Sequence, residues 1–484
     1  MVTYRRQDIF RFLKQAVTSA ASLATRSGPA TPQTFVFGNT SADLDSIVSS
    51  IIYSYFATNS ARQYIPIVNL PDVASGVDLR RLRPELMVAL KLALTTTSGA
   101  VPGDNDAKAE ASILKEGLLT TLDLRRILEQ GADRGKQHLN VMMVDWNALP
   151  HLPNGHGIPG LSDVLKDNLD LSVVGCIDHH FDEEFVPPAK PSNPDPRRIQ
   201  IPVGSCTSLV VNELRGKGLW HDPVDHHEHP QHPEEMVNEA QAAKLALSSI
   251  LIDTINMTEE HKVSETDIEE VVFLEDKIRY AVSVAEDLPW DRKQFYDAVA
   301  DAKEQAVNNL TMQEVLGRDY KEWCEDVYDQ PGKSVRVGIM NVGKPLLWVW
   351  NKAHESTTTF LDEVHEFSTA RNLDVSAVMT TFQDTDGNFN RELALFVWNA
   401  ECVGNAEEFR KRGEDVLGLC NWKKKATEET PSISDVTEKN IFESIKQMEL
   451  PLFNVWQQTE LAKSRKQVAP LLRQAISGHS LEKL

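Results

Sequence analysis

Short apolar runs alternate with stretches of helical periodicity along the first part of the chain. The run at 34–37 is followed at once by a helical stretch at 45–58. We expect strands at 34–37, 64–68, 140–144, 171–177 and 198–203. Strands that are apolar throughout and separated by helices are typical of a parallel sheet covered on both faces. The pattern therefore predicts an α/β fold with a doubly wound parallel sheet.

A second β-rich unit follows a polar helix that we expect at 291–310. Its strands are expected at 334–342, 375–382 and 392–399, with helices such as 357–371, 438–447 and 471–477 between and after them. We therefore predict an N-terminal domain over residues 1–310 and a smaller C-terminal α/β domain over residues 311–484.

Several polar segments are expected to be surface insertions or loops: 94–108, 186–199, 221–234 and 424–436. The 221–234 segment contains five histidines. A solvated loop is favoured there over a metal site, because the segment has no apolar period to supply an ordered scaffold.

The composition excludes several classes of protein. The chain has 484 residues, of which 41% are hydrophobic and 25% charged, values of a globular protein and not of collagen or a disordered chain. Its 50 Lys and Arg against 71 Asp and Glu give a formal net charge of −21, which disfavours binding to nucleic acid or to an anionic membrane. No apolar stretch approaches the roughly 18 residues that a spanning helix needs. Any anionic substrate must then be attracted by a local basic patch and by metal ions.

Residues 1–28 and the cysteines bear on location. The basic, Ser- and Ala-containing N-terminus resembles a mitochondrial presequence, but Ile9, Phe12 and Leu13 after Asp8 favour a capped amphipathic helix. The five cysteines contain no CxxC pair, which favours a reducing compartment. We expect a cytoplasmic protein, with the mitochondrial matrix as the alternative, and favour a monomer.

Candidate metal ligands follow the predicted strands or end a helix in four segments. Asn39, Asp43 and Asp45 lie in GNTSADLDS, Asp145 in VDWN, Asp178, His179 and His180 in IDHH, and Asp253 in LIDT. The i, i+2 spacing of Asp43 and Asp45 is expected to direct both carboxylates outward from an irregular loop. Any one acid in such a place is more often a helix cap or a turn former. Ligands of parallel sheets lie outside the carboxyl ends of the strands, so four such sites together indicate one cluster. Mixed Asp and His ligands suit Mn²⁺, Mg²⁺ or Zn²⁺, and two such cations roughly 3.5–4 Å apart commonly serve phosphoryl hydrolysis.

The order of these motifs resembles that of the DHH phosphoesterases. DxD comes first, then a lone Asp, then Asp-His-His, then another Asp. Farther along, the stretch 319–323 (DYKEW), the run SVRVGIMNV and the stretch 464–468 (SRKQV) resemble the C-terminal substrate domain of family II inorganic pyrophosphatases. The resemblance covers about residues 34–475, with insertions.

The resemblance implies a role for each motif residue. The implied ligands of two divalent cations, Mg²⁺ or Mn²⁺ with Co²⁺ as an alternative, are Asn39, Asp43, Asp45, Asp145, His179 and Asp253. Asp145 would bridge the two cations, Asp178 would orient its neighbouring histidine, and His180 would face the scissile phosphate. Phosphate oxygens would be held from the second domain by Lys321, Arg465 and Lys466.

Two positions bear on the substrate. Asn39 stands where the pyrophosphatases carry His, as in eukaryotic exopolyphosphatases and prune-type proteins, whereas His180 stands where prune-type proteins commonly carry Arg. The resemblance therefore implies hydrolysis of the terminal phosphoanhydride bond of inorganic polyphosphate, or of another short phosphoanhydride. The alternatives are a pyrophosphatase or cyclic-nucleotide phosphodiesterase with the same site, and a prune-type regulatory binding protein.

The 204–208 stretch, GSCTS, precedes an apolar helical run. Its backbone N–H groups suit either a phosphate or the ordinary N-cap of a helix. Cys206 has no base nearby in sequence, so it is not nominated as a nucleophile.

Overall fold

The computed structural model describes residues 6–25, 31–94, 107–131, 135–152, 155–188, 195–222, 233–259, 261–285, 290–328, 330–354, 360–423, 425, 427 and 450–478. The chain divides into two compact units, Met1–Asn308 and Asn309–Leu484, called unit 1 and unit 2 below.

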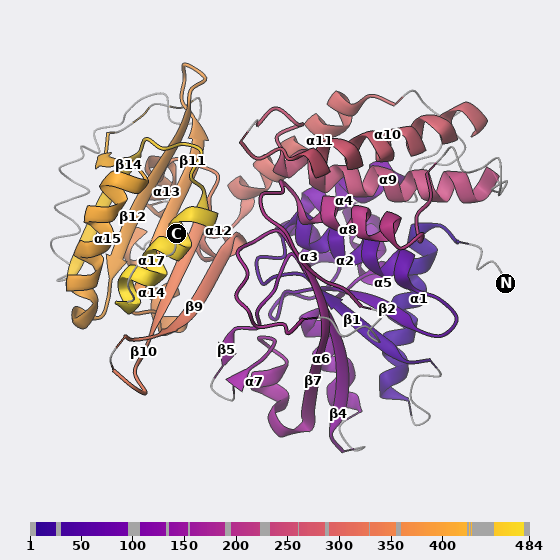
Figure 1. Cartoon of the computed structure of the whole chain (residues 1–484), viewed down its shortest axis with the longest axis horizontal. Coiled ribbons are helices and arrows are strands. Elements are labelled where there is room, and N and C mark those ends of the chain that lie inside the picture. The colour runs from indigo at the N-terminus through magenta and orange to yellow at the C-terminus, as the bar shows by residue number, and fades with distance from the viewer. Residues whose placement is uncertain are drawn as a thin grey trace. The chain divides into compact units, whose positions relative to one another are not determined.

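Unit 1 is built on a six-stranded sheet whose strands are all parallel (Figure 1). The strand order is β3 (Leu119–Thr120), β2 (Gln63–Val68), β1 (Gln33–Phe37), β4 (Gln137–Val144), β7 (Leu169–Asp178) and β8 (Arg197–Ile199). The predicted parallel sheet is confirmed. The last strand is shorter than expected and ends before Pro202, which has no N–H to donate to a strand ladder.

Helices pack on this sheet and on one another. In unit 1 they are α1 (Ile9–Ala21), α2 (Leu44–Ala57), α3 (Val77–Leu82), α4 (Pro84–Leu94), α5 (Ala107–Gly117), α6 (Thr121–Gln130), α7 (Ser162–Leu165), α8 (Cys206–Gly216), α9 (Pro233–Asp253), α10 (Glu265–Ala285) and α11 (Arg292–Ala306). A small hairpin of β5 (His151–Leu152) and β6 (Gly155–His156) follows β4. Apolar side chains of α1 and α6 pack with strand residues in one core. Helix α2 is buried along its whole length and packs against β2, α8 and α9.

Unit 2 contains a mixed sheet. Its strand order is β13 (Leu419–Asn421), β14 (Leu452–Gln458), β12 (Phe389–Val397), β11 (Val375–Gln383), β10 (Ser334–Val342) and β9 (Tyr320–Asp326), with β10 and β11 parallel and the other described pairs antiparallel. The helices are α12 (Met312–Arg318), α13 (Leu346–His354), α14 (Phe360–Ala370), α15 (Val403–Val416) and α17 (Arg465–Ser477). Helices α15 and α17 contribute to the apolar core on one face of the sheet.

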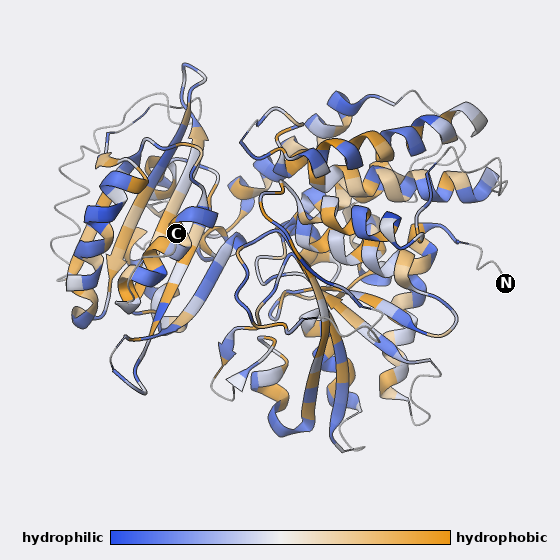
Figure 2. Cartoon of the chain, in the orientation of Figure 1, coloured by the Kyte–Doolittle hydropathy of each residue, from blue (hydrophilic) through white to orange (hydrophobic). Residues whose placement is uncertain are grey.

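The structure differs from the sequence-based expectation in three strands of unit 2. Strands β9, β13 and β14 were not predicted. For β9 the reason is visible in Figure 2: β9 is mostly hydrophilic, whereas β11 and β12 are largely hydrophobic. Backbone pairing with β10, and not an apolar pattern, makes β9 a strand.

Some expectations fall outside the described residues. They are most of the 94–108 and 424–436 segments, part of 186–199, most of the His-rich 221–234 segment, and the helix expected at 438–447. The first helix begins where expected, with Asp8 accepting a hydrogen bond from the Arg11 N–H as the N-cap of α1. Among the described helices, none has both the length and the apolar character needed to cross a bilayer.

Candidate active site

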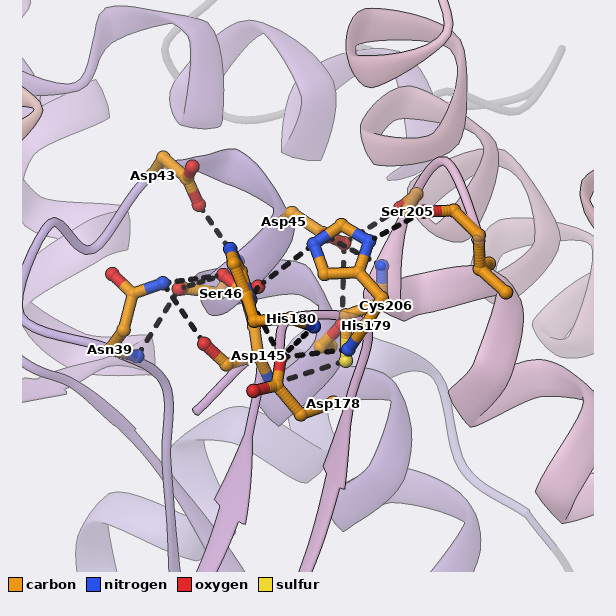
Figure 3. A network of polar contacts seen from close by, with 12 residues as sticks. Asn39, Asp43, Asp45, Ser46, Asp145, Asp178, His179, His180, Ser205 and Cys206 are labelled. Carbon is orange, nitrogen blue, oxygen red and sulfur yellow. Dashed lines mark hydrogen bonds and ion pairs between the residues drawn. The ribbon is translucent and has the colours of Figure 1, made fainter. Parts of the chain in front are cut away.

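The carboxyl ends of three neighbouring strands bring most of the predicted ligands together. Strands β1, β4 and β7 are adjacent in the sheet, and Asn39, Asp145 and Asp178 follow or end them. Figure 3 shows their side chains converging with those of Asp45, His179 and His180. Asp145, Asp178, His179 and His180 each place one potential ligand atom within 4.8 Å of the others.

Asp145 lies at the centre of the cluster and is buried. Its backbone is in the left-handed region, with φ at 52°, a conformation that Asp and Asn adopt more readily than most residues. One carboxylate oxygen, Oδ2, accepts hydrogen bonds from Asn39 Nδ2 at 2.7 Å and from the Ser46 hydroxyl at 2.6 Å. The other oxygen, Oδ1, is buried and accepts no hydrogen bond from any residue that the structure describes.

The charge of Asp145 is destabilised in the protein without cations. Burial raises the pKa of this carboxyl most, the neighbouring His179 lowers it, and the charges of Asp43 and Asp45 raise it further, to about 7. A buried carboxylate oxygen without a donor and surrounded by like charges is in an unfavourable position that a cation relieves.

Asp178 orients the two histidines. Its Oδ1 accepts from the backbone N–H of His179 at 2.8 Å and from His180 Nδ1 at 2.8 Å, and its Oδ2 accepts from Asn147 Nδ2. The acceptor sites of this carboxylate are thus used within the protein. His180 is the more exposed of the two rings, with 26% of its side chain accessible against 6% for His179.

The orientation of His179 fits a divalent cation. Its Nδ1 lies 3.1 Å from the Val203 carbonyl oxygen, which can only accept a hydrogen bond, so Nδ1 carries a proton. Nε2 faces the cluster, where a bound cation would take the place of any proton on that nitrogen. Nε2 is 3.2 Å from Asp145 Oδ1. Two ligand atoms that each lie about 2.1 Å from one octahedral or tetrahedral cation are about 3.0–3.4 Å apart. An imidazole nitrogen and a carboxylate oxygen that face each other at this separation match a pair of ligands to one ion.

Asp45 is held by a cage of donors. It lies in the first turn of α2, and not in an irregular loop pointing outward as the i, i+2 spacing suggested. Its Oδ1 accepts from the hydroxyls of Ser205 at 2.8 Å, Thr207 at 2.7 Å and Ser249 at 2.8 Å, and from the Thr207 N–H at 2.9 Å. Its Oδ2 accepts from the Cys206 N–H at 2.7 Å.

This cage keeps Asp45 charged. Burial alone would raise its pKa, but His179 and the hydrogen bonds of Thr207 and Ser205 outweigh burial and lower the pKa to about 2. Oδ1 is fully used, whereas Oδ2, 3.8 Å from His179 Nε2, is the oxygen left for a cation. The 204–208 stretch therefore caps α8 in the ordinary way, through Ser205, and its N–H groups bind Asp45.

Asp43 and Asp253 lie at the ends of helices. Asp43 is the N-cap of α2, where it accepts from the Ser46 N–H at 3.0 Å. Asp253 ends α9, and its buried Oδ2 has no hydrogen-bond partner within the described part of the chain. Burial and, after it, the charges of Asp45 and Asp43 raise the pKa of Asp253 well above its ordinary value, against the opposing effect of Lys303. Its orphaned oxygen is a second observation that fits a cation.

The loop that carries Asn39 is fixed from two sides. Asn39 Nδ2 donates to Asp145, while its Oδ1 accepts from the Ser41 N–H at 2.8 Å. The buried Arg83 donates to the carbonyl oxygens of Ser41 at 2.5 Å and Ala42 at 2.8 Å. The amide oxygen of Asn39 thus already has one donor, and its role as a cation ligand stays a prediction.

The predicted phosphate-binding residues lie in unit 2. Arg465, the first residue of α17, forms an ion pair between Nη2 and Asp319 Oδ1 at 2.7 Å and donates from Nη1 to the Asp319 carbonyl at 2.9 Å. Although burial opposes it, Arg465, then Asn341 and Lys321, hold the pKa of Asp319 well below its usual range. Arg465 is thus paired with Asp319, and the charge of Lys321 acts on the same carboxylate. Lys466 follows Arg465 in the first turn of α17 and is exposed.

The sequence did not indicate which residues hold the carboxylates in place. They are Ser46, Asn147, Ser205, Thr207 and Ser249. The 204–208 stretch, which contains Ser205 and Thr207, was expected to serve a phosphate or a helix N-cap. Ser249 could have been identified from the sequence, because it precedes Asp253 by one helical turn on α9 and therefore lies on the same face of the helix. The others depend on contacts between segments far apart in sequence.

Two family models match this chain. One described as "DHH family, N-terminal domain" matches residues 33–250, and one described as "DHHA2 domain" matches residues 297–475. All the candidate ligands up to His180 lie within the first match, and Lys321 and Arg465 lie within the second.

Two curated relatives cover most of the chain. A Schizosaccharomyces pombe protein named "Putative exopolyphosphatase" is 28% identical over 445 residues, which are 91% of this chain and 90% of that protein. A Mus musculus protein named "Exopolyphosphatase PRUNE1" is 24% identical over 457 residues, 93% of this chain and 76% of that protein. Among solved structures, an exopolyphosphatase-related protein from Bacteroides fragilis covers 97% of this chain and 96% of its own at 12% identity, with a TM-score of 0.34 that is too low to bear on the fold.

Proposed function

The chain belongs to the DHH family and carries a DHHA2 domain, and from this premise we propose that it is a metal-dependent exopolyphosphatase. It would hydrolyse the terminal phosphoanhydride bond of inorganic polyphosphate and release orthophosphate. The observation that supports this most is that two buried carboxylate oxygens, Asp145 Oδ1 and Asp253 Oδ2, accept no hydrogen bond from any described residue. Asp145 Oδ1 also lies 3.2 Å from His179 Nε2.

The proposed cofactors are two divalent cations, Mg²⁺ or Mn²⁺. The residues that would hold them are Asn39, Asp43, Asp45, Asp145, His179 and Asp253, with Asp145 shared between both. When bound, such cations acidify water and neutralise charge that develops on phosphoryl oxygens. The oxygen-rich donor set suits Mg²⁺, and the single imidazole also suits Mn²⁺.

The chain's own residues would orient the reaction. Asp178 holds the Nδ1 proton of His180, so the Nε2 of that ring is the nitrogen that would face the terminal phosphate. Asn39 and Ser46 fix Asp145 by its Oδ2. From unit 2, Lys321, Arg465 and Lys466 would bind phosphate oxygens, with Arg465 exchanging its contact with Asp319 for one with the substrate.

Polyphosphate is the proposed substrate because the relatives that cover most of the chain are named as exopolyphosphatases. The fold is also compatible with other phosphoanhydrides, because a fold does not fix its substrate.

Phosphate release from a panel of substrates tests the proposal. Purified protein is incubated with pyrophosphate, tripolyphosphate, long-chain polyphosphate and a cyclic nucleotide, each with Mg²⁺, Mn²⁺ or a chelator. We expect release from tripolyphosphate and the long chain that stops with chelator and in an Asp145→Asn variant. Faster turnover of pyrophosphate or of the cyclic nucleotide would assign one of those activities instead. If no phosphate is released from any of these substrates, the alternative of a regulatory binding protein is favoured.

A further inference from the structure

One segment, residues 203–207, contacts three of the predicted cation ligands. The Val203 carbonyl lies 3.1 Å from His179 Nδ1 and keeps a proton on that nitrogen. Backbone and side-chain donors of Ser205, Cys206 and Thr207 bind Asp45, as described above. Cys206 Sγ also lies 3.1 Å from the backbone N of Asp145, within hydrogen-bond distance. The positions of His179, Asp45 and Asp145 therefore depend on where the 203–207 segment lies.

Asp267 of α10 holds this segment through hydrogen bonds to its backbone. It is fully buried, and its Oδ2 accepts from the Gly204 N–H at 2.8 Å, while its Oδ1 accepts from the Ser205 N–H at 3.3 Å and the Ser208 hydroxyl at 2.6 Å. Oδ2 also accepts from the N–H of Ser264 at 2.8 Å, which caps α10. The contacts to the 203–207 segment reach about sixty positions along the chain and are not needed for capping.

Gly204 lets the segment approach Asp267 closely. A Cβ at this position would lie 2.8 Å from Thr254 Cγ2, 2.9 Å from the Lys262 carbonyl oxygen and 3.0 Å from Asp267 Oδ2. Two of these three neighbours are rigid or tightly bonded, so only glycine fits. Close packing at Gly204 and two backbone hydrogen bonds to Asp267 together define the segment's position.

We propose that Asp267 is a positioning residue of the hydrolytic site, which orients His179 and Asp45 through the 203–207 segment without touching substrate or cation. This inference rests on the proposed function, since it concerns the same cluster. Helix α10 contributes no predicted ligand. Through Asp267 it would nevertheless set the positions of two ligands, His179 and Asp45. Partners that orient ligands from outside the coordination sphere typically contribute about 10- to 100-fold to metal affinity or activity.

The test compares Asp267→Asn with a matched control, Asp123→Asn. Asp123 occupies the equivalent third position of α6, where it completes a capping box with Thr120 and accepts from the Ser75 N–H at 3.0 Å. Each variant replaces one capping carboxylate that also bonds a second loop. In Asp267→Asn, the new NH₂ group replaces an acceptor oxygen. In either orientation of the amide it faces a backbone N–H, that of Gly204 or that of Ser205, so one of these two hydrogen bonds is lost.

The measurements are the melting temperature, Mn²⁺ affinity by calorimetry on chelator-treated protein, and kcat and KM on tripolyphosphate. We expect both variants to lose similar melting temperature, but only Asp267→Asn to lose about 10- to 100-fold in Mn²⁺ affinity and kcat, with KM little changed. Ser208→Ala, which removes a single bond to Asp267, should show a smaller loss in the same direction and serves if Asp267→Asn does not fold.

Mn²⁺ affinity equal in Asp267→Asn and Asp123→Asn would overturn the inference and leave Asp267 as a helix cap. If Asp267→Asn does not fold, wild-type affinity in Ser208→Ala overturns it. Mn²⁺ binding with no hydrolysis by the wild type would remove the proposed function alone, because the affinity comparison still decides the role of Asp267. A wild type that binds no Mn²⁺ would overturn both.

Discussion

Replacing Asp145 by Asn should make the cation-free protein more stable at pH 8 while abolishing hydrolysis. An Asn side chain keeps the two accepted hydrogen bonds if its Oδ1 faces Asn39 and Ser46. Its NH₂ group then takes the place of the orphaned oxygen and can donate to His179 Nε2, which lies 3.2 Å from that position. The left-handed backbone at this position, with φ at 52°, also suits Asn.

The magnitude follows from the pKa of Asp145, which rises from 3.8 to about 7 on folding. Because the folded pKa is raised, the contribution of this group to stability is fully present below pH about 4 and is lost as the pH rises through 7. Three pKa units correspond to about 4 kcal/mol. The stability difference between the Asn variant and the wild type should therefore grow from near zero at pH 4 to about 2–4 kcal/mol at pH 8, since packing differences absorb part of it.

Urea denaturation in the presence of a chelator, repeated between pH 4.5 and 8, measures this difference. Asp178→Asn is the control, because the oxygens of Asp178 already accept from backbone and side-chain donors, so it should destabilise at every pH. Adding Mn²⁺ at pH 8 should stabilise the wild type and leave Asp145→Asn unchanged. An Asn variant less stable than the wild type at pH 8, or a difference that does not vary with pH, would refute the reasoning.

Three further predictions concern single side chains. Arg465→Ala should raise KM for polyphosphate about tenfold or more and leave Mn²⁺ affinity intact, because a charge-assisted hydrogen bond contributes about 1.5–3 kcal/mol. Steady-state kinetics measures KM and calorimetry measures the Mn²⁺ affinity. An unchanged KM would mean that Arg465 serves only as the partner of Asp319. Asn39→His should tighten Mn²⁺ binding and shift preference towards pyrophosphate, and equal affinities by calorimetry would exclude residue 39 as a ligand. Ser249→Ala removes a donor to Asp45 at 2.8 Å and should lower the free energy of unfolding at pH 7 by about 1 kcal/mol, as urea titration can show; no loss would mean that the other donors suffice.

The parallel sheet of unit 1 could be predicted because each of its main strands is apolar and is followed by a helix. The same rule located Asp145 and Asp178, since polar residues that end neighbouring parallel strands must meet at one edge. The pattern did not find β9, whose polar residues form a strand only because β10 offers its backbone as a partner.

The network around the carboxylates could not be predicted, because it joins segments that sequence spacing does not relate. Asp45 and Ser249 are 204 positions apart, and their hydrogen bond exists only in the folded packing of α2 against α9. The orientation of Asp45 differs from the sequence-based expectation for a related reason. The i, i+2 spacing predicts a loop, whereas Asp43 caps α2, and the buried Asp45 lies in the first turn of that helix.

The reactivity of the buried Cys206 thiol can report local opening of the site. Its Sγ lies between the Asp145 N–H and the Ile177 carbonyl, and burial, followed by the charges of Asp45 and Asp145, raises its pKa well above the ordinary value. The thiolate that alkylating reagents require is therefore suppressed while the site is closed. The rate at which iodoacetamide labels Cys206, read by mass spectrometry against the exposed Cys420, then measures how often this part of unit 1 opens, and a bound cation should slow that labelling.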